Sequence, residues 1–109
     1  MAEAGADVVG ALVGVTAGGL SGAKDSLTLE KATDAAKNMV LAAKEVNPKI
    51  MVFTHGGPFK DPQTAEYSML HSGAVGYAAG SSGERLPTET AIIEVTKSYK
   101  NMKAGMGYK

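Results

Sequence analysis

The stretch that decides the fold is DVVGALVGV, residues 7–15, a nearly continuous apolar run that is rich in β-branched valine. Such a run is typical of a strand buried on both faces, either in a parallel sheet covered by helices or in a packed barrel. It is followed by TAGGLSGAK, residues 16–24, which is a loop of small residues. Together the two segments predict a buried strand that ends in a glycine-rich loop.

The same order recurs twice further along the chain. KIMVFTH, residues 49–55, is predicted to be a second buried strand, and residues 56–58 (GGP) turn the chain after it. AVGYAA, residues 74–79, is predicted to be a third strand, which its glycine weakens. GSSG, residues 80–83, is a third loop of small residues.

Helical patterns separate these strands. Thr28 or Ser26 can cap a first helix, whose apolar positions recur at helical spacing until residues 47–48 (NP) stop it. Asp61, followed by a proline, is a good start for a second and shorter helix, which is expected to end near His71.

The ends of the chain continue the alternation. Residues 2–7 (AEAGAD) resemble the end of a helix, a glycine cap and the entry to a strand. A last helix is expected from Pro87 or Thr88 to about Met102, and the tail at residues 103–109 is expected to fray. The inner side of that helix is predicted to consist of Ala91, Ile92, Val95 and Tyr99.

Alternating strands and helices predict right-handed βαβ crossovers and a parallel sheet, within one α/β domain over residues 1–109. Parallel strands with apolar edges, so few in number, invite pairing with another chain. We therefore expect a partial barrel that self-associates, pairs with a complementary fragment, or belongs to a longer barrel.

Composition narrows the classes of function. Eleven basic and eleven acidic residues give a formal charge of zero, which argues against binding to nucleic acid. The chain has no cysteine, so thiol catalysis and disulfides are excluded. No apolar run is long enough to span a bilayer. A cysteine-free chain without a visible signal peptide is expected to be cytoplasmic.

The glycine clusters all follow predicted strands, at the edge where parallel α/β proteins bind ligands. Glycines let backbone N–H groups approach an anion closely, and serine hydroxyls add further donors. The alternative is that tight turns after strands simply require glycine. For three clusters in phase we favour a site for a small phosphate or carboxylate, formed by Gly18, Gly19, Gly56, Gly57, Ser81 and Ser82.

Three charged or titratable residues lie in these loops. Arg85, the chain's one arginine, offers a bidentate fork to an anion, or alternatively a structural ion pair with Glu84 or Glu89. His55 ends the second strand at the predicted edge and is the best candidate for acid–base work, with Glu84 second. His71 is expected to decorate a helix end. The spacing of histidines and acids predicts no dedicated metal site.

Several segments in order resemble one known family, the phosphoenolpyruvate hydrolase-like TIM-barrel proteins. The resemblance is carried by AEAGADVV, TAGGLSGAKDSLTL, HGGP followed by DPQTAEY, and GSSGERLPTE. It implies that these strands are the last three of an eight-stranded barrel. It also implies kinship with enzymes that act on small phospho- or oxo-acids by hydrolase- or lyase-like chemistry, often with Mg²⁺.

Two departures from the family pattern bear on function. The first five strands of such a barrel have no counterpart here, so any metal-binding acids on them are expected to be missing and the isolated chain need not be active. The first predicted strand also ends in GALVGVTAGG, where relatives often carry a histidine and a methionine. The rival interpretations are a non-catalytic truncated barrel that self-assembles and an interaction module of a larger protein.

Overall fold

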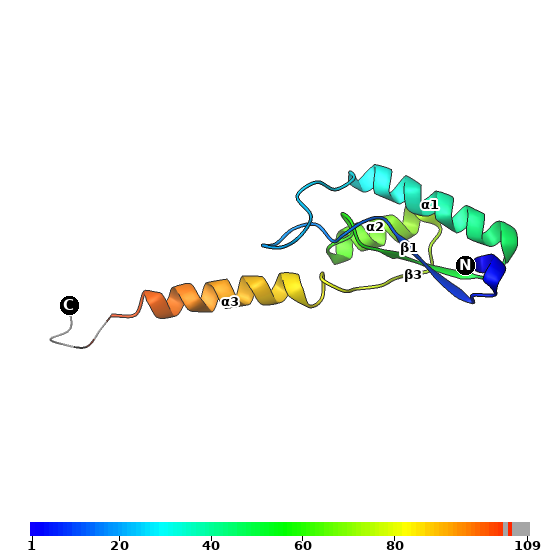
Figure 1. The fold of residues 1–109 in the computed structure, drawn as a ribbon. Coiled ribbons are helices and arrows are strands. Elements are labelled where there is room, and N and C mark those ends of the chain that lie inside the picture. The colour runs from blue at the N-terminus through cyan, green and yellow to red at the C-terminus, as the bar shows by residue number, and fades with distance from the viewer. Residues whose placement is uncertain (104, 106–109) are drawn as a thin grey trace.

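The computed structural model describes residues 1–103 and 105, in which strands and helices alternate (Figure 1). The elements in chain order are the 3₁₀ helix η1 (Ala2–Ala4), β1 (Val8–Leu12), α1 (Leu29–Val46), β2 (Met51–His55), α2 (Pro62–Ser72), β3 (Gly76–Tyr77) and α3 (Arg85–Lys100). The strands form one open parallel sheet in the order β1-β2-β3. The predicted parallel α/β fold is therefore confirmed.

Helix α1 forms where the sequence predicted it. The side chain of Thr28 accepts a hydrogen bond from the Lys31 amide at 3.3 Å, and the helix ends at Asn47 just before a proline. Its buried face consists of small residues spaced by three or four positions, which lets the helix lie close to the sheet. These residues are Ala32, Thr33, Ala36, Val40 and Ala43.

One face of the sheet is covered and the other is open. Val52 and Thr54 of β2 point towards the helices and are buried, whereas Met51 on the opposite face is 45% exposed. On β1, Ala11 is 1% exposed and its neighbour Leu12 is 57% exposed. The prediction that the first strand is buried on both faces is therefore wrong, because α1 and α2 pack on the same side (Figure 1).

The core lies between that covered face and α1. It is built mainly from small side chains, so its packing depends on close approach of the backbones. Its members are Ala11, Ala36, Val40, Ala43, Ile50, Val52 and Ala74. Beneath α2, the buried hydroxyls of Thr54 and Ser68 lie 2.8 Å apart; because Ser68 donates to the Ala65 carbonyl, Thr54 donates to Ser68.

Helix α2 has strong signals at both ends. The Asp61 carboxylate accepts from the Thr64 amide at 2.9 Å, and the Asp61 amide donates to the Thr64 hydroxyl oxygen at 3.2 Å, which completes a capping box. The Thr64 amide also holds the pKa of Asp61 below its ordinary value. Gly73 caps the other end with φ of 81°. His71 stacks on Tyr67 there and is bonded to its carbonyl, as expected of a residue that decorates a helix end.

All three strands are shorter than predicted, and β2 begins at Met51 two residues after the predicted start. β1 ends at Leu12 because Gly14, with φ of 128°, turns the chain out of the sheet. β3 has two residues, and a side chain at Gly76 would lie 2.9 Å from the Phe53 ring, so glycine is required for this approach. At the N-terminus, the expected helix end and glycine cap are confirmed, since η1 ends at Gly5 with φ of 88°.

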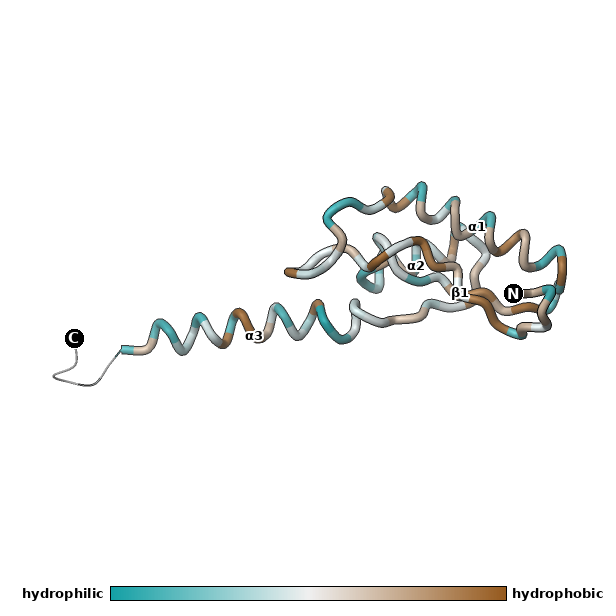
Figure 2. Tube along the Cα trace, viewed as in Figure 1, coloured by the Kyte–Doolittle hydropathy of each residue, from teal (hydrophilic) through white to brown (hydrophobic). Residues whose placement is uncertain are grey.

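Helix α3 differs most from the prediction. It begins at Arg85, two residues before Pro87, and none of its residues is buried. Ala91, Ile92, Val95 and Tyr99 were expected to face the core, and this was wrong because all four lie in solvent. The helix projects from the sheet, so the molecule measures 74 × 25 × 20 Å (Figure 1). Brown apolar positions remain along its exposed surface (Figure 2).

The elongation is large for this chain length. The radius of gyration is 19.5 Å, against about 13 Å for a compact domain of similar size. In the part of the chain that the structure describes, no helix combines the length and apolarity needed to cross a membrane.

Replacing Asp61 by alanine is expected to lower the free energy of unfolding by about 1 kcal/mol, because the first turn of α2 loses its cap. Urea unfolding followed by circular dichroism measures the change. Asp61→Asn is the matched control, since asparagine also caps helices, and it should unfold close to the native chain. Equal losses in the two variants would contradict the capping argument.

Candidate functional site

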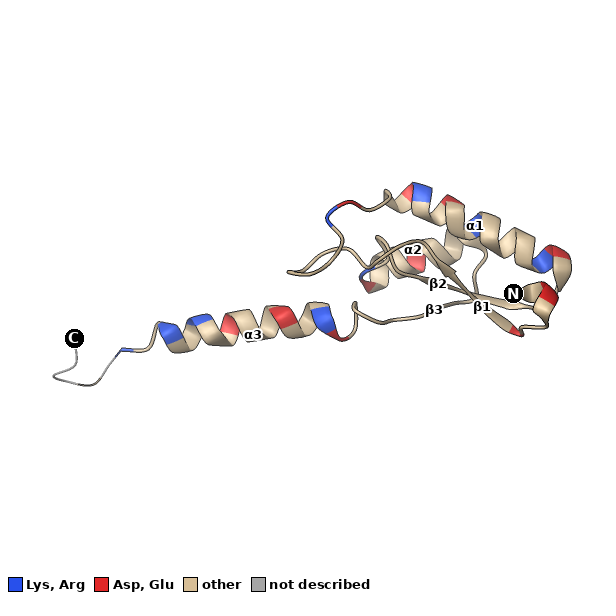
Figure 3. Ribbon diagram, in the orientation of Figure 1, with Lys and Arg blue, Asp and Glu red and all other residues tan. Residues whose placement is uncertain are grey.

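The three strand-end loops occupy one edge, because β1, β2 and β3 are parallel and in register. The first two loops are joined by backbone hydrogen bonds. The Val13 amide donates to the His55 carbonyl at 3.1 Å, the Gly57 amide to the Gly14 carbonyl at 2.9 Å, and the Ala17 amide to the Gly57 carbonyl at 2.9 Å. The charged residues lie on the helices and in the loops at both ends of the sheet, and the strands carry no Asp, Glu, Lys or Arg (Figure 3).

Gly56 and Gly57 are glycines for a steric reason. Both are buried and have positive φ, of 77° and 56°. A Cβ atom on Gly56 would lie 2.1 Å from the Gly14 carbonyl oxygen, and one on Gly57 would lie 2.9 Å from a methyl of Val13. The loops can meet this closely only without side chains. In this arrangement the Gly57 amide is bonded within the protein.

His55 is oriented by the neighbouring strand. Its Nδ1 lies 2.6 Å from the carbonyl oxygen of Ala78, just beyond β3. A carbonyl can only accept, so Nδ1 donates this hydrogen bond, and Nε2 is the ring nitrogen on the other side. Gly80 lies beside the ring, where a Cβ would be 3.5 Å from Cε1. His55 shares the open face of the sheet with Met51, because Val52 and Thr54 point to the helices.

Tyr77 joins the second and third loops. Its hydroxyl donates to the Phe59 carbonyl at 2.8 Å and lies 2.7 Å from the Ser82 hydroxyl. Since the Tyr77 proton goes to the carbonyl, Ser82 donates to the tyrosine oxygen. Ser82 is thereby fixed in place, and its oxygen retains acceptor capacity.

Arg85 makes the structural ion pair that was one of its two predicted roles. Its Nη1 lies 3.1 Å from the Glu89 carboxylate, one turn along α3, and donates to the Gly18 carbonyl at 2.9 Å. The guanidinium rests against Gly19, where a Cβ would lie 2.4 Å from it. Arg85 thus ties the first loop to the start of α3.

The Glu89 carboxylate accepts hydrogen bonds from the first loop and from Arg85 at the start of α3. One oxygen accepts from the Leu20 amide at 2.9 Å, and the other lies 3.1 Å from Arg85 and 3.5 Å from the Ser21 hydroxyl. The Leu20 N–H, followed by Arg85, lowers the pKa of Glu89 below its ordinary value of 4.5. The carboxylate is therefore well solvated by protein groups although it lies near the surface.

The remaining predicted residues are less engaged. Ser81 is half-buried and its carbonyl accepts from the Leu86 amide. Glu84 is exposed at the N-cap of α3 without a side-chain cap bond, and its amide donates to the Gly80 carbonyl. The structure therefore places Glu84 on the third loop, facing solvent.

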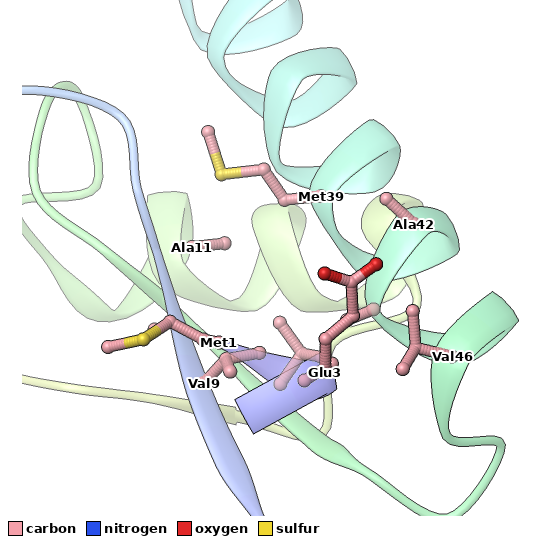
Figure 4. Close-up of a pocket in the computed structure, with 11 residues that line it drawn as sticks. Met1, Glu3, Val9, Ala11, Met39, Ala42 and Val46 are labelled. Carbon is pink, nitrogen blue, oxygen red and sulfur yellow. The ribbon is translucent and has the colours of Figure 1, made fainter. Parts of the chain in front are cut away.

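A hollow of 590 Å³ lies next to the second and third loops. It is lined by Lys60, Asp61, Pro62, Ser82, Leu86, Pro87, Thr90, Ala91 and Glu94. Another cavity, of 340 Å³, lies beside β1 between η1 and the end of α1 (Figure 4). Its lining is apolar except for Glu3, and it is flanked by Val9 at the opposite end of the strand from the loops. The hollow at the loops is kept as the candidate ligand site because it adjoins two strand-end loops; of the predicted site residues it is lined by Ser82, and not by His55 or Arg85.

A magnesium ion finds no ready ligand set here. Among the residues that the structure describes, no group of three or more histidine or acidic side chains lies close enough to hold a metal ion. Mg²⁺ prefers several oxygen ligands. No metal ligand is therefore assigned among the described residues.

Sequence reasoning missed three contributors to the site, which are Tyr77, Leu20 and Ser21. Tyr77 lies in a glycine-containing strand five residues before Ser82, and a tyrosine there needs a partner for its hydroxyl. The i,i+4 spacing of Arg85 and Glu89 was a usable signal for their pairing. No local signal indicates that Leu20 and Ser21 complete the Glu89 contact, because they lie 69 and 68 positions away.

Comparison with known proteins gives consistent matches. Residues 1–102 match the phosphoenolpyruvate hydrolase-like family. The ToMV susceptible protein tm-1(GCR26) of Solanum lycopersicum is 39% identical over 94% of this chain and 14% of its own length. The ToMV resistance protein Tm-1(GCR237) of the same plant is 38% identical, with the same coverage. A putative transcriptional regulatory protein, y4pA, of Sinorhizobium fredii is 31% identical over 93% of this chain and 17% of its own length. The chain thus spans less than a fifth of these relatives.

Replacing Gly56 by alanine is expected to cost about 1–3 kcal/mol in the free energy of unfolding, because a positive φ and a clash with Gly14 act together. Gly80→Ala is the matched control, since its Cβ would make an ordinary contact with His55. Urea unfolding of both variants tests this expectation. It fails if Gly80→Ala is destabilised as much as Gly56→Ala.

Acidification is expected to release the first loop from Glu89. Since the pKa of Glu89 is lowered in the folded chain, the contact contributes fully above 4.5 and is lost as the pH falls through the lowered value. The amide resonance of Leu20, followed by NMR from about pH 6 to about pH 3, should shift upfield as its acceptor is protonated. The same titration of Glu89→Gln should lack this step, and a step that persists there would assign it to another group.

Proposed function

The chain belongs to the phosphoenolpyruvate hydrolase-like family, and from that premise we propose that its strand-end loops bind a small phospho- or oxo-acid, with His55 as the acid–base group. The observation that carries this proposal is the orientation of His55 by the Ala78 carbonyl, which leaves Nε2 free. A histidine held in this way at the carboxyl end of a parallel strand occupies the usual place for catalytic groups in barrels.

The proposed ligand contacts follow from the loops. Gly18, Gly19 and Gly56 present backbone to the edge, and Ser81 and Ser82 lie in the third loop beside the hollow at Lys60. Gly57 supports the site by holding the first loop, through its bond to Gly14. Arg85 sets the electrostatics of the first loop. Glu84 is the second candidate for proton transfer, because it is exposed on the third loop and free to turn towards a ligand.

The proposal includes a larger assembly, and the exposed face of the sheet is the argument for it. Leu12 and Met51 are 57% and 45% exposed on the face that a closed barrel would bury. We propose that further strands, from the same protein or from another copy of this chain, cover this face and wall the site. The small share of its relatives that the chain spans is consistent with this proposal.

The alternative function is that of a non-catalytic truncated barrel that self-assembles or serves as an interaction module. The exposed apolar side chains of α3 favour it, since Ile92, Val95 and Tyr99 are 57%, 47% and 68% exposed. The names of two relatives, which describe susceptibility and resistance to ToMV, are compatible with a role in interactions.

Turnover of phosphoenolpyruvate with added Mg²⁺ tests the enzymatic proposal. We expect His55→Ala to lower the rate by about 100-fold or more, because proton transfer loses its positioned group. His71→Ala is the matched control, since that histidine stacks on Tyr67 at the end of α2 and should leave the rate unchanged. If the native chain and His55→Ala are equally inert, the enzymatic proposal fails and the interaction module is favoured.

A further inference from the structure

The Glu89 carboxylate accepts hydrogen bonds from a set of donors that would also suit an external oxyanion. A backbone N–H from Leu20, the Ser21 hydroxyl and the Arg85 guanidinium converge on its two oxygens. Charge-assisted bonds of these kinds are the ones with which proteins hold carboxylates and phosphates. The donors come from two segments far apart in sequence, the first loop and the start of α3.

The first loop is shaped around this group. A side chain at Gly19 would collide with both Glu89 and Arg85, at 2.1 and 2.4 Å. A side chain at Gly22 would lie 1.9 Å from the Gly18 carbonyl, the atom that holds Arg85. Both positions need glycine so that the loop can wrap closely around the ion pair.

We propose that Glu89 is an internal ligand, and that this site accepts a small external carboxylate or phosphate when Glu89 turns away. The proposal deepens the proposed function and rests on it, since it identifies Glu89 as the group that an incoming anion displaces. The site is then kept closed by the protein's own carboxylate until an anion competes for it.

Exchange is feasible because Glu89 lies at the surface. The side chains of Glu89 and Arg85 are 19% and 22% exposed, so the carboxylate can rotate into solvent without unfolding the helix. Arg85 stays in place after that rotation, because its bond to the Gly18 carbonyl does not involve Glu89. The Leu20 amide and the guanidinium are then left facing one another without an acceptor between them.

The test uses the full chain, with acetate and inorganic phosphate as probes and sodium chloride at equal ionic strength as the reference. In Glu89→Ala, we expect acetate and phosphate to bind at least about tenfold more tightly than in the native chain. Acetate should also return the Leu20 amide resonance towards its native position. The readout is NMR titration of the Leu20 and Ser21 amides.

Two variants separate this site from general charge effects. Glu45→Ala removes one negative charge from α1, at an exposed residue away from the strand-end loops, and should bind acetate as weakly as the native chain does. The double variant that combines Glu89→Ala with Arg85→Ala should bind acetate no more tightly than the native chain does. If acetate shifts the Leu20 amide resonance equally in Glu89→Ala and Glu45→Ala, the proposal is overturned.

Each of the other possible results also supports or overturns the proposal. If Glu89→Ala fails to fold, Glu89→Gln keeps an acceptor oxygen without the charge. Tighter acetate binding by Glu89→Gln than by the native chain supports the proposal, and equal binding overturns it. Acetate binding to Glu89→Ala, in a chain that neither binds nor turns over phosphoenolpyruvate, supports the internal ligand while the proposed function fails. Phosphoenolpyruvate binding that is equally tight with and without Glu89 leaves the proposed function intact and overturns the internal ligand.

Discussion

The amide of Gly57 donates to the carbonyl of Gly14, and this contact sets how closely the first two strand-end loops approach. It is possible only because the backbones touch without side chains between them. The other loop contacts at this edge of the sheet depend on this hydrogen bond. The Ala17 amide returns to the Gly57 carbonyl, which directs the first loop towards the start of α3. There Arg85 and Glu89 hold the loop through Gly18 and Leu20.

The local patterns foresaw most of the fold. Thr28 and Asp61 cap helices where the sequence indicated, and the parallel alternation was confirmed. The failures came where a local pattern needed knowledge of what surrounds it. The apolar run at residues 7–15 indicates burial, but which face is covered depends on where the helices pack. Likewise, the apolar residues of α3 indicate an inner side, and the structure gives that helix no surface to pack against.

The residues of the candidate site were named from the sequence, but their contacts were not. His55, Arg85 and the glycine clusters were named from their positions after strands, and the structure brings their loops to one edge. What they bond to could not be read locally, because each partner lies far along the chain. The Ala78 carbonyl orients His55 from 23 positions away, and the Gly18 carbonyl engages Arg85 from 67. Such pairs are specified by the sheet register, which strand patterns alone leave open.

The alanine-lined contact between α1 and the sheet also bears on how this sequence can vary. Ala36 and Ala43 belong to the core between α1 and the sheet, and Ala36 is 0% exposed. Further truncation at such positions removes little volume, whereas added methylenes would push the helix off the strands. The size of the side chain at these helix positions therefore has an upper limit. Related chains can exchange alanine for glycine or serine at some cost in stability. They can accept a larger residue only if the residue at the facing strand position becomes smaller.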